Sequence, residues 1–271
     1  MLAEIDQSQV VSEDVTLGNG MNAFVARPAR LGPCPTVVLL HERYGLVQHN
    51  RDLATRFAAE GHVCLAPNLY FRESNLEAIA KGEANGTLTD PQVVEDFGFA
   101  YEYLTTHVPS ADLGHLAVVV VCATGRHPLV IAASRPEVGA CVVFYGAAYK
   151  REWFPEDMHT ENLARSRAPV LGIFGELDNL IAVEDVQRFR GALEAAGRSY
   201  QIRLYPDAPH GYLNDTMPGR YRRPQAESAW NTLREFLDRV EHDGYPPDRL
   251  RWQFEADHSA DYDFSKNRRQ E

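Results

Sequence analysis

An α/β fold, with a mainly parallel central sheet and helices on both faces, is predicted by three features of the sequence. Short apolar runs recur along the 271 residues, and most are followed by a segment with helical spacing of apolar residues. The runs are apolar throughout rather than alternating, which is typical of strands covered on both faces. The apolar and charged fractions, 44% and 24%, suit a globular protein with a sizeable core. Strands that alternate with helices indicate right-handed crossovers and a parallel sheet.

The first element is expected to be a hairpin over residues 10–28, because Asn19-Gly20 accepts the positive φ angles of a tight turn. Strands are expected within residues 36–42, 62–70, 116–122, 140–146, 169–178 and 199–211. Helices are expected at residues 50–61, 90–107, 128–136, 183–197 and 227–237, with glycine as the stop signal of the first and fourth. Ligands of such folds bind outside the carboxyl ends of the strands, so functional residues are expected just after them.

Charge and cysteine usage narrow the function classes. The formal net charge of −11 opposes long-range attraction to nucleic acid or to anionic membranes. No apolar stretch is long enough to span a bilayer, and the first residues lack the pattern of a secretory signal. The cysteines, Cys34, Cys64, Cys122 and Cys141, show no CxxC spacing and indicate a reducing compartment. We therefore expect a cytoplasmic monomer or homodimer that acts on a small-molecule substrate, with neither nucleic acid nor membrane as partner.

Cys122 ends the run Val118–Val121 and has four possible roles: core filler, disulfide partner, metal ligand or nucleophile. Buried packing is the commonest role of a cysteine. Its place at a strand end, before small residues and a helix, favours a nucleophile lifted out of the sheet. The main-chain N–H of Ala123 would then point toward an acyl oxyanion, and the helix dipole would favour the thiolate.

An acid and a base follow in the order of the α/β-hydrolase arrangement. Asp178 comes directly after one expected strand, and His210 lies in the loop after the next. Taken singly, Asp178 could cap a helix and His210 could be an ordinary loop histidine. Because three such residues follow three strand ends, we interpret Cys122, Asp178 and His210 as a catalytic triad.

From about Pro35 to Leu237 the sequence resembles the dienelactone hydrolase family, the cysteine branch of the α/β hydrolases. The resemblance is carried by LLHERYG, CLAPNLYFR, VCATGR, FGELDN and PHGY. It implies an α/β-hydrolase fold, the triad Cys122, Asp178 and His210, and a functional glutamate at Glu42. It also implies that the main-chain N–H of Arg43 is the second oxyanion donor.

The sequence departs from the family pattern near the nucleophile and near the base. Glycines usually lie two residues before and two after the cysteine, where this chain has Val120 and Thr124, so a looser or shifted turn is expected. Asn214 stands where family members often have an arginine that binds the substrate carboxylate. Arginines that could replace it are Arg72, Arg220, Arg222 and Arg223, of which Arg72 is included among the candidate site residues.

Glu42 can also be interpreted from chemistry alone. A carboxylate after an apolar strand and close to a thiol can hold the thiol proton or restrain the thiolate, and partial burial would raise its pKa. The alternative is a capping or surface glutamate. His41 and Glu42 begin like HExxH, but Gly45 breaks that metal motif, so neither a metal nor another cofactor is expected.

Aromatic residues near the strand ends are candidates for a substrate pocket, although each could equally be a core residue. They are Tyr44, Tyr70, Phe71, Tyr145 and Tyr212, and with Asn214 and Arg72 they complete the predicted site.

The domain prediction is a single α/β-hydrolase domain over residues 1–240, followed by a C-terminal arm or tail over 241–271. The last segment has no helical or strand period, and Trp252 and Phe254 favour an arm. The function expected is a thiol-dependent hydrolase of small esters or lactones, of the kind formed in aromatic-ring degradation. The alternative is a binding protein, or an enzyme of altered reaction, on the same scaffold.

Overall fold

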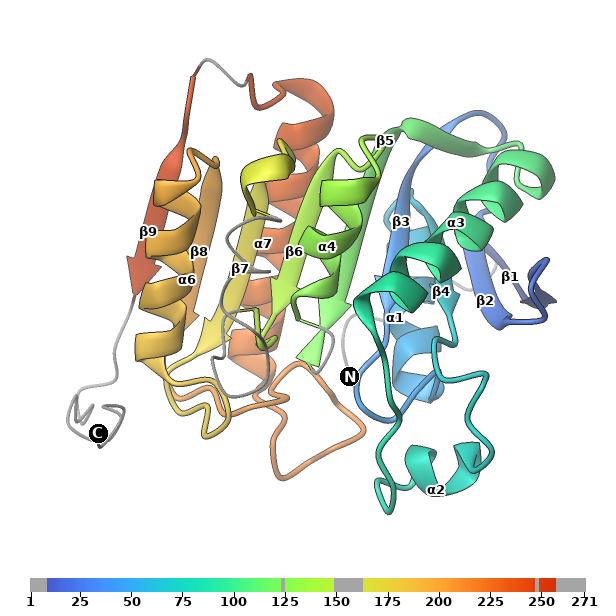
Figure 1. The fold of residues 1–271 in the computed structure, drawn as a ribbon, viewed down its shortest axis with the longest axis horizontal. Coiled ribbons are helices and arrows are strands. Elements are labelled where there is room, and N and C mark those ends of the chain that lie inside the picture. The colour runs from blue at the N-terminus through green and yellow to red at the C-terminus, as the bar shows by residue number, and fades with distance from the viewer. Residues whose placement is uncertain (1–8, 123–124, 149–162, 247–248, 257–271) are drawn as a thin grey trace.

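The computed structural model describes residues 9–122, 125–148, 163–246 and 249–256. Ala123 and Thr124, named above, lie outside these residues. Strands and helices alternate along most of the described chain, and the strands form one sheet in the order β1-β2-β4-β3-β5-β6-β7-β8-β9 (Figure 1). None of the helices in the described ranges combines the length and hydropathy needed to cross a membrane.

The hairpin and the parallel part of the sheet are where the sequence predicted them. β1 (Val10–Thr16) and β2 (Asn22–Pro28) are antiparallel, and Gly20 between them has φ 83°. β2 is also antiparallel to β4, whereas every pairing from β4 through β9 in the sheet order is parallel. The parallel part of the sheet, apart from its edge strand β9, consists of β3 (Cys34–Leu40), β4 (Val63–Pro67), β5 (Ala111–Val121), β6 (Ala140–Phe144), β7 (Val170–Gly175) and β8 (Tyr200–Tyr205).

Helices cover both faces of the sheet, as Figure 1 shows. One face carries α3 (Asp90–His107), α4 (His127–Ser134) and α6 (Val183–Ala195), and the other carries α1 (Gln48–Ala59) and α7 (Arg223–His242). The short helix α2 (Leu76–Ala80) was not predicted, although Asn75 caps it by accepting a hydrogen bond from the N–H of Ala78. Thr89 caps α3 in a reciprocal capping box with Gln92, and a proline in the first turn of α4 is tolerated because no donor is needed there.

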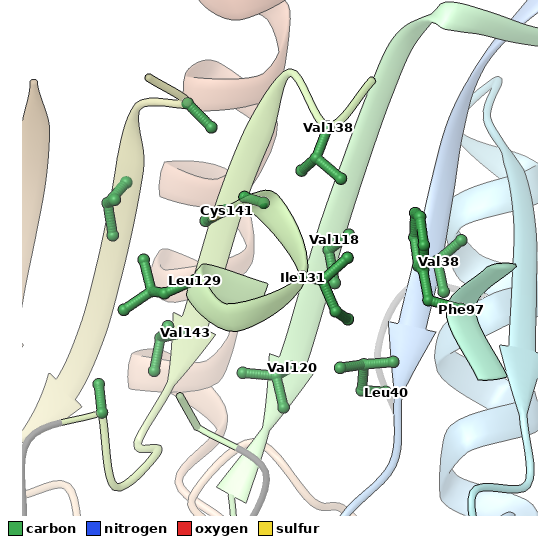
Figure 2. Close-up of a cluster of buried hydrophobic side chains, with 14 of the residues drawn as sticks. Val38, Leu40, Phe97, Val118, Val120, Leu129, Ile131, Val138, Cys141 and Val143 are labelled. Carbon is green, nitrogen blue, oxygen red and sulfur yellow. The ribbon is translucent and has the colours of Figure 1, made fainter. Parts of the chain in front are cut away.

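The valine run that ends β5 is apolar at every position because side chains on both faces of the strand are buried there. Val118 and Val120 pack with Phe97 of α3 and with Leu129 and Ile131 of α4 (Figure 2). Val119 and Val121 point the other way and join the core beneath α1 and α7. Val120 is fully buried, so the valine that replaces the family glycine is a core residue of the strand.

The C-terminal arm contributes a strand, which the sequence did not predict. β9 (Trp252–Ala256) pairs in parallel with β8, and Arg203 of β8 forms an ion pair with Glu255. The part of the arm within the described ranges therefore extends the sheet.

Two buried histidines lie close to the carboxyl ends of the strands. His41 follows β3 and is 0% exposed, and His49 at the start of α1 is 2% exposed. Burial lowers the pKa of each to about 4, below the 6.5 of a free imidazole, and hydrogen bonds to main-chain oxygens only partly oppose this for His41. Both side chains are therefore neutral at pH 7.

We expect these histidines to make the protein sensitive to acid. Between pH 6.5 and 4 these histidines are protonated in the unfolded chain but remain neutral in the native protein. The free energy of unfolding therefore has its full value above pH 6.5 and decreases as the pH falls. At pH 5 each contributes a loss of about 2 kcal/mol. His49→Gln is expected to reduce the difference in unfolding free energy between pH 7 and pH 5, measured by urea denaturation, whereas the exposed His107→Gln is not. Equal differences in both variants would contradict this assignment.

We also expect Gly175 to be sterically required. A Cβ on this last residue of β7 would overlap the main-chain oxygen of Ala208, in the loop that carries His210. Gly175→Ala is expected to lower the free energy of unfolding by about 1–3 kcal/mol, as overpacking does. Gly191→Ala is the control, because a Cβ there meets nothing within 4 Å in the interior of α6, and should raise stability by about 0.5–1 kcal/mol. Urea denaturation measures both, and an unchanged Gly175→Ala would refute the steric argument.

Candidate active site

The carboxyl ends of three parallel strands bring together the residues predicted as a triad. Cys122 directly follows β5, Asp178 follows β7, and His210 lies in the loop after β8. Cys122 Sγ lies 3.0 Å from Nε2 of His210, and Nδ1 of His210 lies 2.9 Å from Oδ2 of Asp178. The three side chains thus form one continuous chain of hydrogen bonds, which leaves Nε2 facing the thiol.

The backbone of Cys122 is in the left-handed region, with φ 66°. A cysteine in this conformation is strained by roughly 1–3 kcal/mol, and such strain persists only where the surroundings impose it. Gly125 supplies one restraint, because a Cβ there would overlap the main chain of Gly146 and Ala147 after β6. The close approach of these two segments requires a glycine at 125, while the predicted looseness around Thr124 concerns a residue outside the described ranges.

Asp178 serves the loop and the histidine at the same time. Its Oδ1 accepts hydrogen bonds from the main-chain N–H groups of Leu180 and Ile181, both at 2.8 Å, while Oδ2 faces His210. The residue is 3% exposed. The carboxylate therefore orders the loop before α6 and faces His210, whereas α6 has Ala182 as its N-cap and no side-chain cap.

The imidazole of His210 is made more basic by the acidic groups that it contacts. Burial alone would lower its pKa, but the hydrogen bonds to Asp178 and Cys122, with the charges of both groups, raise the pKa to about 10. The ring of Tyr145 packs edge-on against the imidazole, with centroids 5.2 Å apart. The site therefore favours the imidazolium form that results when His210 takes a proton from a thiol.

Glu42 is a buried carboxylate in the same region and is not a surface glutamate. It is 3% exposed, and burial raises its pKa. The amide of Asn214, the charges of His210 and Arg220, and the hydroxyl of Tyr145 oppose that shift. Its main chain is also held, since Nδ1 of His41 lies 2.7 Å from the Glu42 carbonyl oxygen while Nε2 of His41 accepts from the N–H of Leu69. Sequence reasoning considered His41 only as part of a metal motif and missed this positioning contact.

Asn214, a predicted substrate-binding residue, makes side-chain contacts that the sequence did not predict. Its Nδ2 donates to Oε2 of Glu42 at 3.0 Å, and its Oδ1 accepts from the main-chain N–H and the hydroxyl of Thr216. The residue is 1% exposed. Its amide therefore holds Glu42 and is closed to a ligand.

Arg72, another predicted substrate-binding residue, also has a partner that the sequence did not predict. Its guanidinium makes two 2.8 Å hydrogen bonds to the carboxylate of Asp96 in α3, and Asp96 is fully buried. In this bidentate pair the guanidinium charge of Arg72 is already balanced by Asp96, so it is less available to a substrate carboxylate.

The aromatic candidates divide into site and core. Tyr212 is fully buried and packs between Tyr145 and Tyr205, so it is a core residue behind the candidate site. Tyr145 is equally buried but reaches both His210 and the charge of Glu42. Phe71 is partly buried and contacts the core, and the guanidinium of Arg72 lies over its ring.

Tyr70 is buried at 4% exposure, whereas Tyr44 is only half-buried. Burial, and secondarily the charge of Cys122, raise the pKa of Tyr70 to about 12. Tyr44 is half-buried under the guanidinium of Arg43, whose Nη2 also bonds the side chain of Asn85 at 3.0 Å. Among the described residues the main-chain N–H of Arg43 makes no hydrogen bond. Ala123, the other predicted oxyanion donor, lies outside those residues.

Comparison with known proteins was made for sequence and for structure. The family model described as "Dienelactone hydrolase family" matches residues 21–241. A protein of Escherichia coli O157:H7 named "Putative carboxymethylenebutenolidase" is 33% identical over 228 residues, which cover 81% of this chain and 83% of that protein. A Bradyrhizobium protein named "Probable 2-oxo-3-(5-oxofuran-2-ylidene)propanoate lactonase" is 28% identical over 82% of this chain and 90% of its own length.

Solved structures show the same fold. The crystal structure of a "Putative Dienelactone Hydrolase" from Klebsiella pneumoniae matches with TM-score 0.75 and 27% identity, covering 84% of this chain and 98% of that one. A dienelactone hydrolase-like promiscuous phosphotriesterase from metagenomic libraries, 19% identical with TM-score 0.71, supports the fold alone. The match over residues 21–241 and the 33% identical relative show that this chain, an α/β-hydrolase fold, belongs to the dienelactone hydrolase family.

Proposed function

We propose that the chain is a thiol-dependent hydrolase of small ester or lactone substrates, with Cys122 as nucleophile. The observation that carries the proposal is the continuous contact from Cys122 Sγ through His210 to Asp178, at 3.0 and 2.9 Å. Nucleophile, base and orienting acid within hydrogen-bond reach are the signature of covalent acyl transfer. Relatives named for lactone hydrolysis support the substrate class.

In the first half of the reaction, Sγ forms a bond to the carbonyl carbon while the thiol proton passes to Nε2 of His210. The electron pair of the carbonyl moves to its oxygen, and the main-chain N–H groups of Arg43 and Ala123 are proposed to stabilise that oxyanion. When the C–O bond breaks, His210 returns the proton to the leaving oxygen. In a lactone this oxygen stays in the same molecule, and a thioester to Cys122 remains.

In the second half, water attacks the thioester while His210 removes its proton. Collapse of the second oxyanion breaks the C–S bond, releases the carboxylic acid and restores the thiol. Asp178 stays ionised throughout and stabilises the imidazolium. The water and the substrate balance the reaction, so its steps call on no cofactor.

Glu42 is proposed to control the Cys122 thiol, either by holding its proton or by restraining the thiolate. Its burial and raised pKa are suited to a carboxyl that can hold a proton close to the thiol. The hydrogen bond from Asn214 fixes its orientation.

The test is hydrolysis of short aryl esters by the purified protein and its variants. We expect Cys122→Ser and Cys122→Ala to lower kcat by at least about a hundredfold, and Glu42→Gln to lower it while the melting temperature changes little, because each removes chemistry rather than packing. Cys141→Ala is the control for loss of a thiol, since Cys141 is fully buried. Unchanged hydrolysis in the Cys122 variants would contradict the proposal and favour a binding protein or an altered reaction.

We further expect a relaxed requirement for a carboxylate on the substrate. Asn214 is neutral, buried and bonded to Glu42, and Arg72 is paired with Asp96. Arg220 is the exposed guanidinium nearest in sequence to the base, and its side chain lies against Gly211. The measurement compares kcat/KM for a carboxylate-bearing lactone with that for its methyl ester.

A preference for the acid above about a hundredfold, equivalent to about 2.7 kcal/mol, would show that a cationic clamp exists and would overturn this expectation. Arg220→Gln then identifies whether Arg220 is that clamp, with the exposed Arg249→Gln as the control for loss of a positive charge.

A further inference from the structure

A buried carboxylate, that of Asp90 in α3, contacts two residues that follow Cys122 closely in the sequence. Oδ1 of Asp90, at the first position of α3, lies 2.8 Å from Nη2 of Arg126 and 3.5 Å from Nε2 of His127. Asp90 is 7% exposed and His127 is 5% exposed, while the Arg126 side chain is 12% exposed. Two consecutive residues thus converge on one carboxylate that lies far from them in the sequence.

The contact falls where α4 begins. Arg126 is the N-cap residue of α4, and His127 is its first helical residue. The Arg126 side chain makes no capping hydrogen bond, and the first turn of α4 contains no acidic residue. The negative charge that stabilises a helix N-terminus is therefore supplied from outside the helix, by Asp90. Because the pair of Asp90 and Arg126 is neutral as a whole, its charges have little net effect on a thiolate at Cys122.

The same segment carries the strained Cys122. Gly125 is pressed against Gly146 and Ala147 on the side of β6, and Arg126 and His127 are held by Asp90 on the side of α3. A left-handed cysteine relaxes unless its neighbours are restrained. Burial opposes ionisation of Asp90, yet the facing His127 side chain and the charge of Arg126 hold the pKa of Asp90 below its usual value. The carboxylate is thus charged at neutral pH.

We propose that Asp90 is a positioning residue for the nucleophile: through Arg126 and His127 it holds the start of α4, so that Cys122 keeps its left-handed backbone and its contact with His210. The proposal rests on the proposed function, since it concerns the same thiol. It predicts that loss of the Asp90 carboxylate affects the reactivity of Cys122 more than loss of an equally buried carboxylate elsewhere.

The chain offers a matched control on the same helix. Asp96 is fully buried in α3 and paired with Arg72, and it lies about 9 Å along the helix from Asp90 at 1.5 Å per residue. Asp90→Asn and Asp96→Asn each remove one charge from a buried ion pair of α3. Only the first removes a contact with the start of α4.

The experiment measures alkylation of Cys122 by iodoacetamide with mass-spectrometric mapping, together with kcat and KM for an aryl ester and the melting temperature. Asp90→Asn is expected to lower the alkylation rate and kcat about tenfold while KM changes less than about twofold, because positioning acts on the reacting atoms rather than on binding. Asp96→Asn is expected to leave the alkylation rate and kcat within about twofold of wild type, at a comparable melting temperature.

Equal alkylation rates in the two variants would overturn the proposal. If Asp90→Asn does not fold, Arg126→Gln and Arg126→Lys replace it, and the lysine, which keeps a charge facing Asp90, should preserve most of the reactivity that the glutamine loses. Absence of Cys122-dependent hydrolysis by the wild-type protein would refute the proposed function instead. In that case the alkylation rates still decide on Asp90.

Discussion

The left-handed backbone of Cys122 is the constraint on which the rest of the site depends. A side chain at the end of a buried parallel strand would ordinarily stay among its neighbours in the sheet. Reversal of φ at Cys122 takes the thiol out of the sheet to Nε2 of His210. The conformation is unfavourable by itself, so the apolar packing of β5 on both faces must outweigh it. A strand with one solvated face would offer a weaker anchor.

Burial acts in opposite directions on the ionisable groups around this thiol. It favours the neutral forms of His41 and Glu42, whose pKa values are lowered and raised respectively. His210 is nearly as buried, but its partners reverse the effect and raise its pKa. The difference lies in the number of facing acidic groups: His210 has both a carboxylate and a thiol, whereas His41 contacts main-chain groups. The pKa values of His210 and His41 therefore differ because of their hydrogen-bond partners and not because of their exposure.

Local sequence patterns were sufficient for most strands and the main helices, and they singled out the three residues that we predict to form a triad. Cys122, Asp178 and His210 could be found because each follows a strand, and parallel strands present their carboxyl ends at one edge of the sheet. The contacts of Asn214 and Arg72 could not be predicted, because the partner of a polar side chain depends on residues remote in the chain. Glu42 lies far from Asn214 in the sequence, and no periodicity links Arg72 with Asp96. β9 was missed since a short edge strand among charges and prolines has almost no pattern of its own.

The pairing of β9 with β8 determines when the last edge of the sheet can form during synthesis of the chain. β8 leads into the loop that holds the base, and until residues 252–256 have been added it remains the edge of the sheet, with unpaired main-chain groups. Exposed edges of this kind are where partly folded chains pair with one another. Cys122 and Asp178 follow strands that are enclosed earlier, so the side of the candidate site that carries His210 is enclosed last and remains open to such association for longest.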